Sequence, residues 1–156
     1  MIKIITGERD SGKTSYLRYL VKDSKFFSGF LESKKYDKDG KFLGYDLIDI
    51  ETEDVFEFIT IDLNREGKRL DKFIILEEGI NKGKDIILSG INKEKILVVD
   101  EVGRLEIDGE LFHEEIVKAM KSGVEMYITV REELLNEFIE KYELSSRDYK
   151  LIRMGE

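Results

Sequence analysis

The chain of 156 residues contains no cysteine, which excludes disulfide bonds and thiolate metal sites. It also has no excess of positive charge, because 34 acidic residues outnumber 26 basic ones and give a formal net charge of -8. A protein that binds nucleic acid without sequence preference holds the phosphate backbone with a basic face. We therefore expect no nucleic-acid partner.

The chain also lacks an apolar run long enough to span a membrane, which takes about 20 residues. An apolar strand pattern begins at residue 2, so the start of the chain does not match a signal peptide. The acidic balance disfavours binding to an anionic membrane surface. These absences predict a soluble, cytoplasmic protein without a membrane partner. The length is that of one domain, so we expect residues 1–156 to form a single, monomeric unit.

What the sequence does contain is a phosphate-binding loop near its start. Residues 7–14 read GERDSGKT and fit G-x-x-x-x-G-K-[ST] at every fixed position. The β-branched run at 2–5 predicts a strand before the loop, and the spacing of Leu17, Leu20 and Val21 predicts a helix after it. Strand, glycine loop and helix are the context that this motif requires. A plain glycine-containing turn is the alternative, and it does not explain this placement.

The fixed residues of the loop suit a nucleoside triphosphate. Unpaired backbone N–H groups of the loop and of the helix start point at the phosphates, and Gly7 and Gly12 let the backbone come close. Lys13 adds a positive charge for the β- and γ-phosphates, and the Thr14 hydroxyl can ligate Mg²⁺. The predicted nucleotide-binding residues are Gly7, Glu8, Arg9, Asp10, Ser11, Gly12, Lys13, Thr14 and Ser15.

A second apolar run ends in two acidic residues. Residues 95–101 read KILVVDE, which predicts a buried strand that delivers Asp100 to the edge of the sheet where the loop lies. Such an aspartate holds Mg²⁺ beside the loop threonine, so Thr14 and Asp100 are the predicted metal ligands. Glu101 is placed to polarise the attacking water. The alternative for Glu101 is a salt-bridged loop residue.

Arg104 lies just past this acidic pair and is the third predicted catalytic residue, with Glu101 and Lys13. Its guanidinium can reach the phosphates in the manner of an arginine finger. A salt bridge from Arg104 to Glu106 or Glu110 is an equally good interpretation.

The remaining chain alternates predicted strands and helices. Strands are expected at 25–32, 42–50, 53–62, 72–76, 95–100, 124–130 and 149–153, and helices at 77–88, 109–121 and 132–142. A hairpin turn is expected at 34–41 and a polar loop at 64–71. This order predicts a three-layer α/β fold with a mainly parallel sheet, covered on both faces. The three strands after the first helix are expected to form an antiparallel insertion.

Residues 100–107, DEVGRLEI, resemble the motif DE-[IV]-G-x-[ML]-E of the thermophile/cancer-related nucleoside-triphosphatase family, a small branch of the P-loop proteins. Further similarity in SGFLES at 28–33, in GKFLGY at 40–45 and in residues 123–142 extends over nearly the whole chain. The resemblance implies a RecA-like domain that hydrolyses ATP, GTP and related triphosphates with Mg²⁺. It also implies slow turnover and low base selectivity.

The chain departs from this family at the loop. The family usually has G-x-P-G-x-G-K-T, whereas Arg9 and Asp10 stand here in place of the proline and the second glycine. We expect Asp10 to adopt the left-handed backbone of that glycine. Glu8 and Asp10 should weaken phosphate binding unless both point to solvent. Arg131 replaces a proline that commonly follows a later strand, and Arg9 and Arg131 are further candidates to reach the phosphates.

These motifs favour a Mg²⁺-dependent enzyme that hydrolyses nucleoside 5′-triphosphates to diphosphate and phosphate. Two alternatives stay open. A nucleotide or nucleoside kinase would use the same loop, an acceptor pocket built from the hairpin insertion, and a basic lid from Arg65, Lys68 and Arg69. A nucleotide-dependent binding module would switch the contacts of the hairpin with a protein partner.

Overall fold

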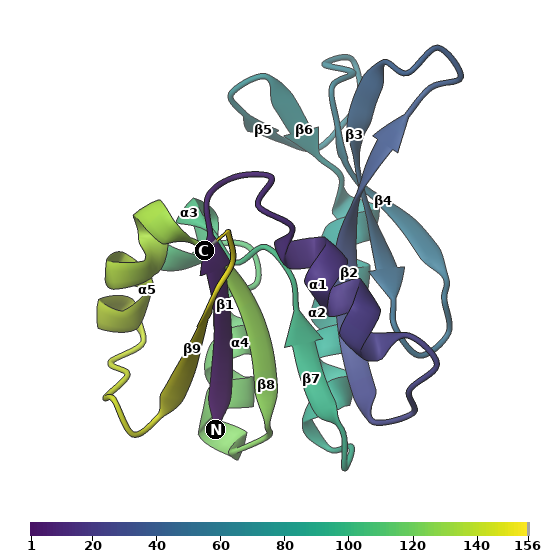
Figure 1. Cartoon of the computed structure of the whole chain (residues 1–156). Coiled ribbons are helices and arrows are strands. Elements are labelled where there is room, and N and C mark those ends of the chain that lie inside the picture. The colour runs from purple at the N-terminus through teal and green to yellow at the C-terminus, as the bar shows by residue number, and fades with distance from the viewer. Residues whose placement is uncertain (156) are drawn as a thin grey trace.

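The computed structural model describes residues 1–155 and gathers their strands into one sheet (Figure 1). Within these residues the sheet has nine strands in the order β5-β6-β4-β3-β2-β7-β8-β1-β9. The strands are β1 (Ile2–Gly7), β2 (Phe27–Tyr36), β3 (Phe42–Asp49), β4 (Val55–Thr60), β5 (Lys68–Leu70), β6 (Phe73–Ile75), β7 (Ile96–Val99), β8 (Met126–Arg131) and β9 (Tyr149–Arg153). The helices are α1 (Lys13–Val21), α2 (Glu77–Ile91), α3 (Arg104–Ile107), α4 (His113–Ser122), the 3₁₀ turn η1 (Glu132–Leu134) and α5 (Leu135–Lys141).

The sheet is mixed, so the prediction of a mainly parallel sheet is not confirmed. Among the strands described, four pairings are parallel and four are antiparallel. The expected antiparallel strands after α1 are present, but they continue the main sheet. The reason is that β2 pairs in parallel with β7 along one edge and antiparallel with β3 along the other.

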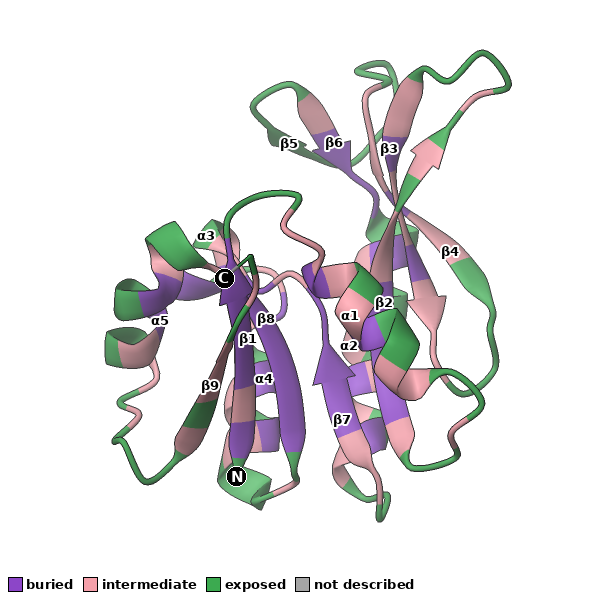
Figure 2. Cartoon of the chain, viewed as in Figure 1, coloured by how far each residue is buried: buried purple, intermediate pink, exposed green. Residues whose placement is uncertain are grey.

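Helices cover both faces of the sheet, in three layers. Within residues 1–155, α1 packs on one face, in a core whose buried members are Ile5, Leu17, Leu31, Val98 and Tyr127. The other helices pack on the opposite face, and their contributions to the larger core include Ile87, Ile107, Ile116 and Phe138. Figure 2 shows the central strands β1, β7 and β8 buried between these layers. The end of β2 and the strands β3–β6, which we call the hairpin strands, are more exposed (Figure 2).

Several local predictions are corrected by the structure. The predicted polar loop at 64–71 contains β5, a short exposed edge strand that pairs with β6. The predicted turn at 34–41 is shorter, because β2 continues to Tyr36. The predicted helix at 109–121 begins only at His113, since Gly109 and Leu111 both have a positive φ, which is incompatible with an α-helix.

Two glycines let α2 lie close to the rest of the molecule. A Cβ atom on Gly83 would lie 2.4 Å from the ring of Phe112, and one on Gly79 would lie 2.6 Å from the backbone of Phe58. The predicted helix at 77–88 is confirmed and extends to Ile91. These glycines weaken the helical signal in the sequence, but in the structure they let α2 pack closely against Phe58 and Phe112.

The carboxyl ends of the parallel strands meet at one edge of the sheet, and the hairpin strands rise above it (Figure 1). The loop after β1, the acidic pair after β7 and the end of β8 all lie at this edge. Within residues 1–155, no helix combines the length and the apolar character needed to cross a membrane.

Candidate active site

The loop after β1 wraps around the side chain of its own lysine. Lys13 Nζ donates to the carbonyls of Gly7 at 3.2 Å and Glu8 at 2.7 Å, and it lies 3.5 Å from the Ser11 hydroxyl. The Lys13 side chain is buried, and this burial lowers its pKa. The ammonium group is thus held at the start of α1 by hydrogen bonds to the backbone carbonyls of the loop.

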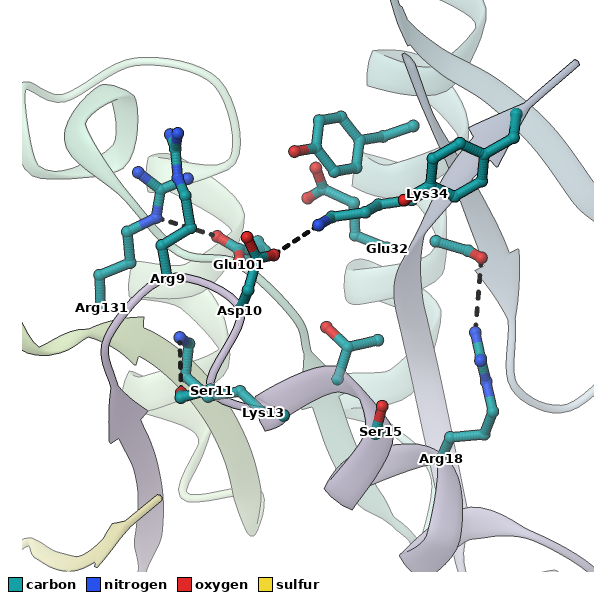
Figure 3. Close-up of a pocket in the computed structure, with 15 residues that line it drawn as sticks. Arg9, Asp10, Ser11, Lys13, Ser15, Arg18, Glu32, Lys34, Glu101 and Arg131 are labelled. Carbon is teal, nitrogen blue, oxygen red and sulfur yellow. Dashed lines mark hydrogen bonds and ion pairs between the residues drawn. The ribbon is translucent and has the colours of Figure 1, made fainter. Parts of the chain in front are cut away.

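Asp10 has the left-handed backbone that the sequence predicted for it, with φ of 60°. Its carboxylate forms an ion pair with Lys34 of β2 (Figure 3), which lowers the pKa of Asp10. The negative charge that we expected beside the phosphates is therefore balanced by a lysine from the neighbouring strand. The pair is largely exposed.

Asp100 is the buried centre of the site, at the end of β7 and 2% exposed. Its Oδ2 accepts hydrogen bonds from the Thr14 hydroxyl at 2.8 Å and from the Glu32 backbone N–H at 2.9 Å. Its Oδ1 accepts one from the Thr129 hydroxyl at 2.6 Å. Burial raises the pKa of Asp100 to about 6, although these hydrogen bonds oppose the shift. The two predicted metal ligands, Thr14 and Asp100, thus lie in direct contact.

Glu101 turns sharply out of the strand. Its φ is 61°, and its backbone N–H donates to the Thr129 hydroxyl at 2.6 Å. The left-handed conformation is strained for a glutamate, and strain of this kind is concentrated at functional sites. The Glu101 carboxylate lies 4.0 Å from the Nε atom of Arg131.

Arg104 is not brought to the loop. Its guanidinium lies 2.6 Å from Glu137 of α5 and 3.3 Å from Asp108, and its side chain is about half exposed. The salt-bridge alternative therefore describes Arg104 better than the arginine-finger one, although with carboxylates other than the expected Glu106 and Glu110. The physical cause is that α3 begins at Arg104 and faces the acidic side of α5.

A cavity of about 380 Å³ lies above the loop (Figure 3). Arg131, at the end of β8 beside Gly7, lines this cavity, whereas Arg104 does not. Gly7 and Glu8 do not line the cavity, and their carbonyls hold Lys13 instead. The lining residues are Arg9–Ser15 and Arg18 from the loop and α1, Glu32, Ser33, Lys34, Tyr36 and Tyr45 from β2 and β3, and Glu101 and Arg131.

Sequence reasoning missed Glu32 and Thr129. Thr129 is fully buried in the apolar strand β8, and a buried hydroxyl in such a strand is the signal that identifies it. Glu32 lies in β2, where burial and the negative charges of Glu101 and Asp100 raise the pKa of its carboxyl group well above the usual range. Both residues come from strands that neighbour β7 in the sheet, although they are distant from it in the sequence.

Glu106, the last residue of the DEVGRLE motif, is buried beneath the site. One of its carboxylate oxygens accepts from the Gly103 N–H at 2.9 Å, and the other accepts from the Phe112 N–H at 3.4 Å. Glu106 therefore holds α3 and the start of α4 in place behind the acidic pair. Burial raises the pKa of this carboxyl group to about 7.

The oxygen atoms of Thr14 and Asp100 form a donor set that suits a hard divalent cation. Among residues 1–155, no group of three acidic, histidine or cysteine side chains could hold a metal by itself. A cation bound here would complete its coordination with phosphate oxygens and water, as Mg²⁺ does in nucleotide enzymes.

Comparison with known proteins agrees with this geometry. A family model described as NTPase matches residues 3–154. The chain is 25% identical over 144 residues to the nucleoside-triphosphatase THEP1 of Methanocaldococcus jannaschii, which covers 90% of this chain and 84% of that protein. It is 29% identical over 108 residues to the THEP1 of Saccharolobus solfataricus, which covers 66% of this chain and 60% of that protein.

Two solved structures share the fold. The crystal structure of THEP1 from the hyperthermophile Aquifex aeolicus has a TM-score of 0.76 at 18% identity and covers 99% of this chain and 90% of that one. The solution structure of a human cancer-related nucleoside triphosphatase has a TM-score of 0.73 at 16% identity, with coverages of 99% and 88%. The resemblance seen in the sequence is thereby confirmed. Because the family model spans residues 3–154, this chain belongs to the NTPase family and is a nucleotide-binding hydrolase of the nucleoside-triphosphatase kind.

Proposed function

We propose that the chain hydrolyses nucleoside 5′-triphosphates, ATP and GTP among them, to diphosphate and phosphate with Mg²⁺ and with low base selectivity. The observation that carries the proposal is the 2.8 Å hydrogen bond between the Thr14 hydroxyl and the Asp100 carboxylate, which joins the phosphate loop to the acidic pair. The names of the relatives support hydrolysis of triphosphates in general.

In this proposal the triphosphate binds over the loop and the start of α1. Lys13 exchanges the carbonyls of Gly7 and Glu8 for oxygens of the β- and γ-phosphates, and the backbone N–H groups of the loop point at the same anion. Arg9 and Arg131 add positive charge at the rim of the cavity.

Thr14 and Asp100 would hold Mg²⁺, which neutralises charge on the phosphates when bound. Glu101 accepts a hydrogen bond from the attacking water and directs the water at the γ-phosphorus. The Arg131 guanidinium lies beside the Glu101 carboxylate and limits the directions in which that carboxylate can point. Catalysis then consists mainly of positioning and charge stabilisation, which is what phosphoryl transfer requires of a protein.

We propose further that residues 1–156 act as one nucleoside-triphosphatase domain, because the loop and the acidic pair belong to the same sheet. Residue 156 lies outside the described residues. A cytoplasmic location and a monomeric state are also proposals, which rest on composition.

The proposal is tested by measuring phosphate release from ATP, GTP, CTP and UTP with Mg²⁺. The wild-type chain is expected to release phosphate from all four. Lys13→Ala removes the charge that faces the β- and γ-phosphates and is expected to abolish nucleotide binding and turnover. Lys22→Ala removes an exposed lysine at the end of α1 and serves as the matched control, with wild-type rates. Equal turnover in wild type and Lys13→Ala would contradict the proposal.

A further inference from the structure

Four aromatic side chains form a connected series on the hairpin strands. The ring centre of Phe42 lies 5.2 Å from that of Tyr45, 6.1 Å from that of Tyr36 and 6.3 Å from that of Phe73, each in an edge-to-face arrangement. Within residues 1–155, neither hydrophobic core includes any of the four. Tyr36 is exposed and the other three rings are half-buried, so part of this apolar surface stays open to solvent, which is typical of a binding site.

These rings line a second cavity, which we call the hairpin cavity. It has a volume of about 1070 Å³ and lies between the hairpin strands and the segment around α3. Its apolar walls come from Ile59 and Ile61 on the hairpin side and from Leu105 and Leu111 on the opposite side. Small-molecule sites typically have volumes of about 300–1,000 Å³ and mostly apolar walls. The hairpin cavity therefore has the size and the lining of a site for an organic ligand.

The hairpin cavity opens into the cavity above the phosphate loop. Glu32, Lys34, Tyr45, Glu101 and Arg131 line both. Arg9 and Asp10 of the loop also line the hairpin cavity, so a ligand there can contact Glu101 beside the phosphate loop. Phosphoryl transfer requires the attacking and leaving oxygens to lie on opposite sides of the phosphorus. A ligand hydroxyl that contacts Glu101 could therefore take the place of the attacking water.

We propose that the hairpin cavity binds a nucleoside, a flat heteroaromatic ring that carries alcohol hydroxyls, as an acceptor of the γ-phosphoryl group. This inference rests on the proposed function, because the same loop must deliver the triphosphate. The acceptor hydroxyl oxygen forms a bond to the γ-phosphorus, and the bond from that phosphorus to the bridging oxygen breaks. The nucleoside diphosphate leaves, and the hydroxyl proton passes to the Glu101 carboxylate and then to solvent.

The distribution of charge favours an uncharged acceptor. The cations at the junction, Arg9, Lys34 and Arg131, lie beside the phosphate loop, where the triphosphate uses their charge. Away from this junction the hairpin cavity is lined by charges of both signs, Asp71, Glu106 and Glu133 with Lys72 and Arg104, among aromatic and aliphatic walls. A base can stack on the aromatic series while its sugar hydroxyls extend toward Glu32 and Glu101.

The test incubates the wild-type chain with ATP, Mg²⁺ and adenosine, guanosine, cytidine or uridine in turn. Free phosphate and nucleoside monophosphate are measured separately. With at least one nucleoside, nucleoside monophosphate is expected to form faster than free phosphate. Phe42→Leu and Phe73→Leu, each made alone, remove ring contacts and are expected to raise the KM for that nucleoside about fivefold. Phosphate release without nucleoside should stay unchanged in both.

Phe26→Leu is the matched control, because Phe26 is 73% exposed and lines neither cavity at the loop. It should leave the nucleoside KM unchanged. Phosphate release from ATP without any nucleoside monophosphate would overturn the inference and leave the proposed function intact, and so would binding of a nucleoside without its phosphorylation. Phosphorylation without hydrolysis would support the inference and overturn the proposed function. Absence of both products would overturn both.

Discussion

Asp100 is the residue at which the separate parts of the site meet, since its two oxygens accept from α1, β2 and β8. The motifs of the sequence were enough to pair it with Thr14. They could not find Thr129 or Glu32, because no motif says that β8 and the distant β2 lie on either side of β7 in the sheet. They left Arg104 open as an arginine finger or a salt-bridged residue, and could not identify its partners Asp108 and Glu137, because no motif specifies the packing of α3 against α5.

Asp10 provides a prediction about nucleotide affinity. Asn tolerates the left-handed backbone at this position, so Asp10→Asn removes the charge and releases Lys34 without altering the loop. The KM for ATP is expected to fall about two- to fivefold at low ionic strength, the range of an exposed ion pair. Added salt should reduce the difference from wild type. Steady-state kinetics at two salt concentrations check this, and a raised KM would mean that the ion pair with Lys34 holds the loop in its binding conformation.

Glu106 provides a prediction about pH. Burial raises its pKa from 4.5 to about 7. Between these pH values Glu106 is therefore protonated in the native state but ionised in the unfolded chain. The contribution of Glu106 to stability is thus present at acidic pH and is lost as the pH rises from about 4.5 to 7. Over that window it amounts to about 3 kcal/mol. Glu106→Gln should remove this part of the pH dependence, as measured by urea unfolding from pH 4.5 to 8.

The control for this comparison is Glu114→Gln, which alters an exposed glutamate of α4 and should keep the wild-type slope. Parallel stability curves for wild type and Glu106→Gln would show that Glu106 is ionised at acidic pH in the native state.

At the scale of elements, the positions of most strands and helices follow from the apolar patterns. Their pairing does not, because alternation along a strand says which side chains share a face and not which strand lies beside it. The hairpin strands were therefore expected as an insertion, whereas β2 joins them to the sheet. Sequence analysis missed the short strand β5, because its three residues are all exposed and two of them, Lys68 and Arg69, are charged. No apolar alternation marks such a strand.

Gly83 provides a prediction at this scale, because it sets the distance between α2 and Phe112. A methyl group there would lie 2.4 Å from the Phe112 ring, which also packs against Phe30 and Phe58. Gly83→Ala should lower the free energy of unfolding by about 1–3 kcal/mol, even though alanine favours a helix by about 1 kcal/mol. Asn81→Ala, at an exposed position of the same helix, should be neutral or slightly stabilising. Urea unfolding compares them, and a Gly83→Ala chain as stable as wild type would show that α2 can shift.

At the scale of the whole molecule, the residues of the candidate site lie together at one edge of the sheet. The loop follows β1, the acidic pair follows β7, and β8 lies between them and contributes Thr129 and Arg131. The hairpin strands above this edge close the site on one side and supply the walls of the hairpin cavity. Sequence motifs can predict this edge, because parallel strands present their carboxyl ends together. The second cavity depends on how the hairpin continues the sheet, which no motif records.

The most direct test of the central claim is turnover and nucleotide binding by Glu101→Gln. Glutamine has the same shape as glutamate but cannot draw a proton from water, and it keeps Lys13, Thr14 and Asp100 in place. The variant should bind a non-hydrolysable ATP analogue with Mg²⁺ as the wild type does, by titration calorimetry. Its kcat for phosphate release should fall by about 100-fold or more. Wild-type turnover in Glu101→Gln would contradict the claim that this carboxylate directs the attacking water.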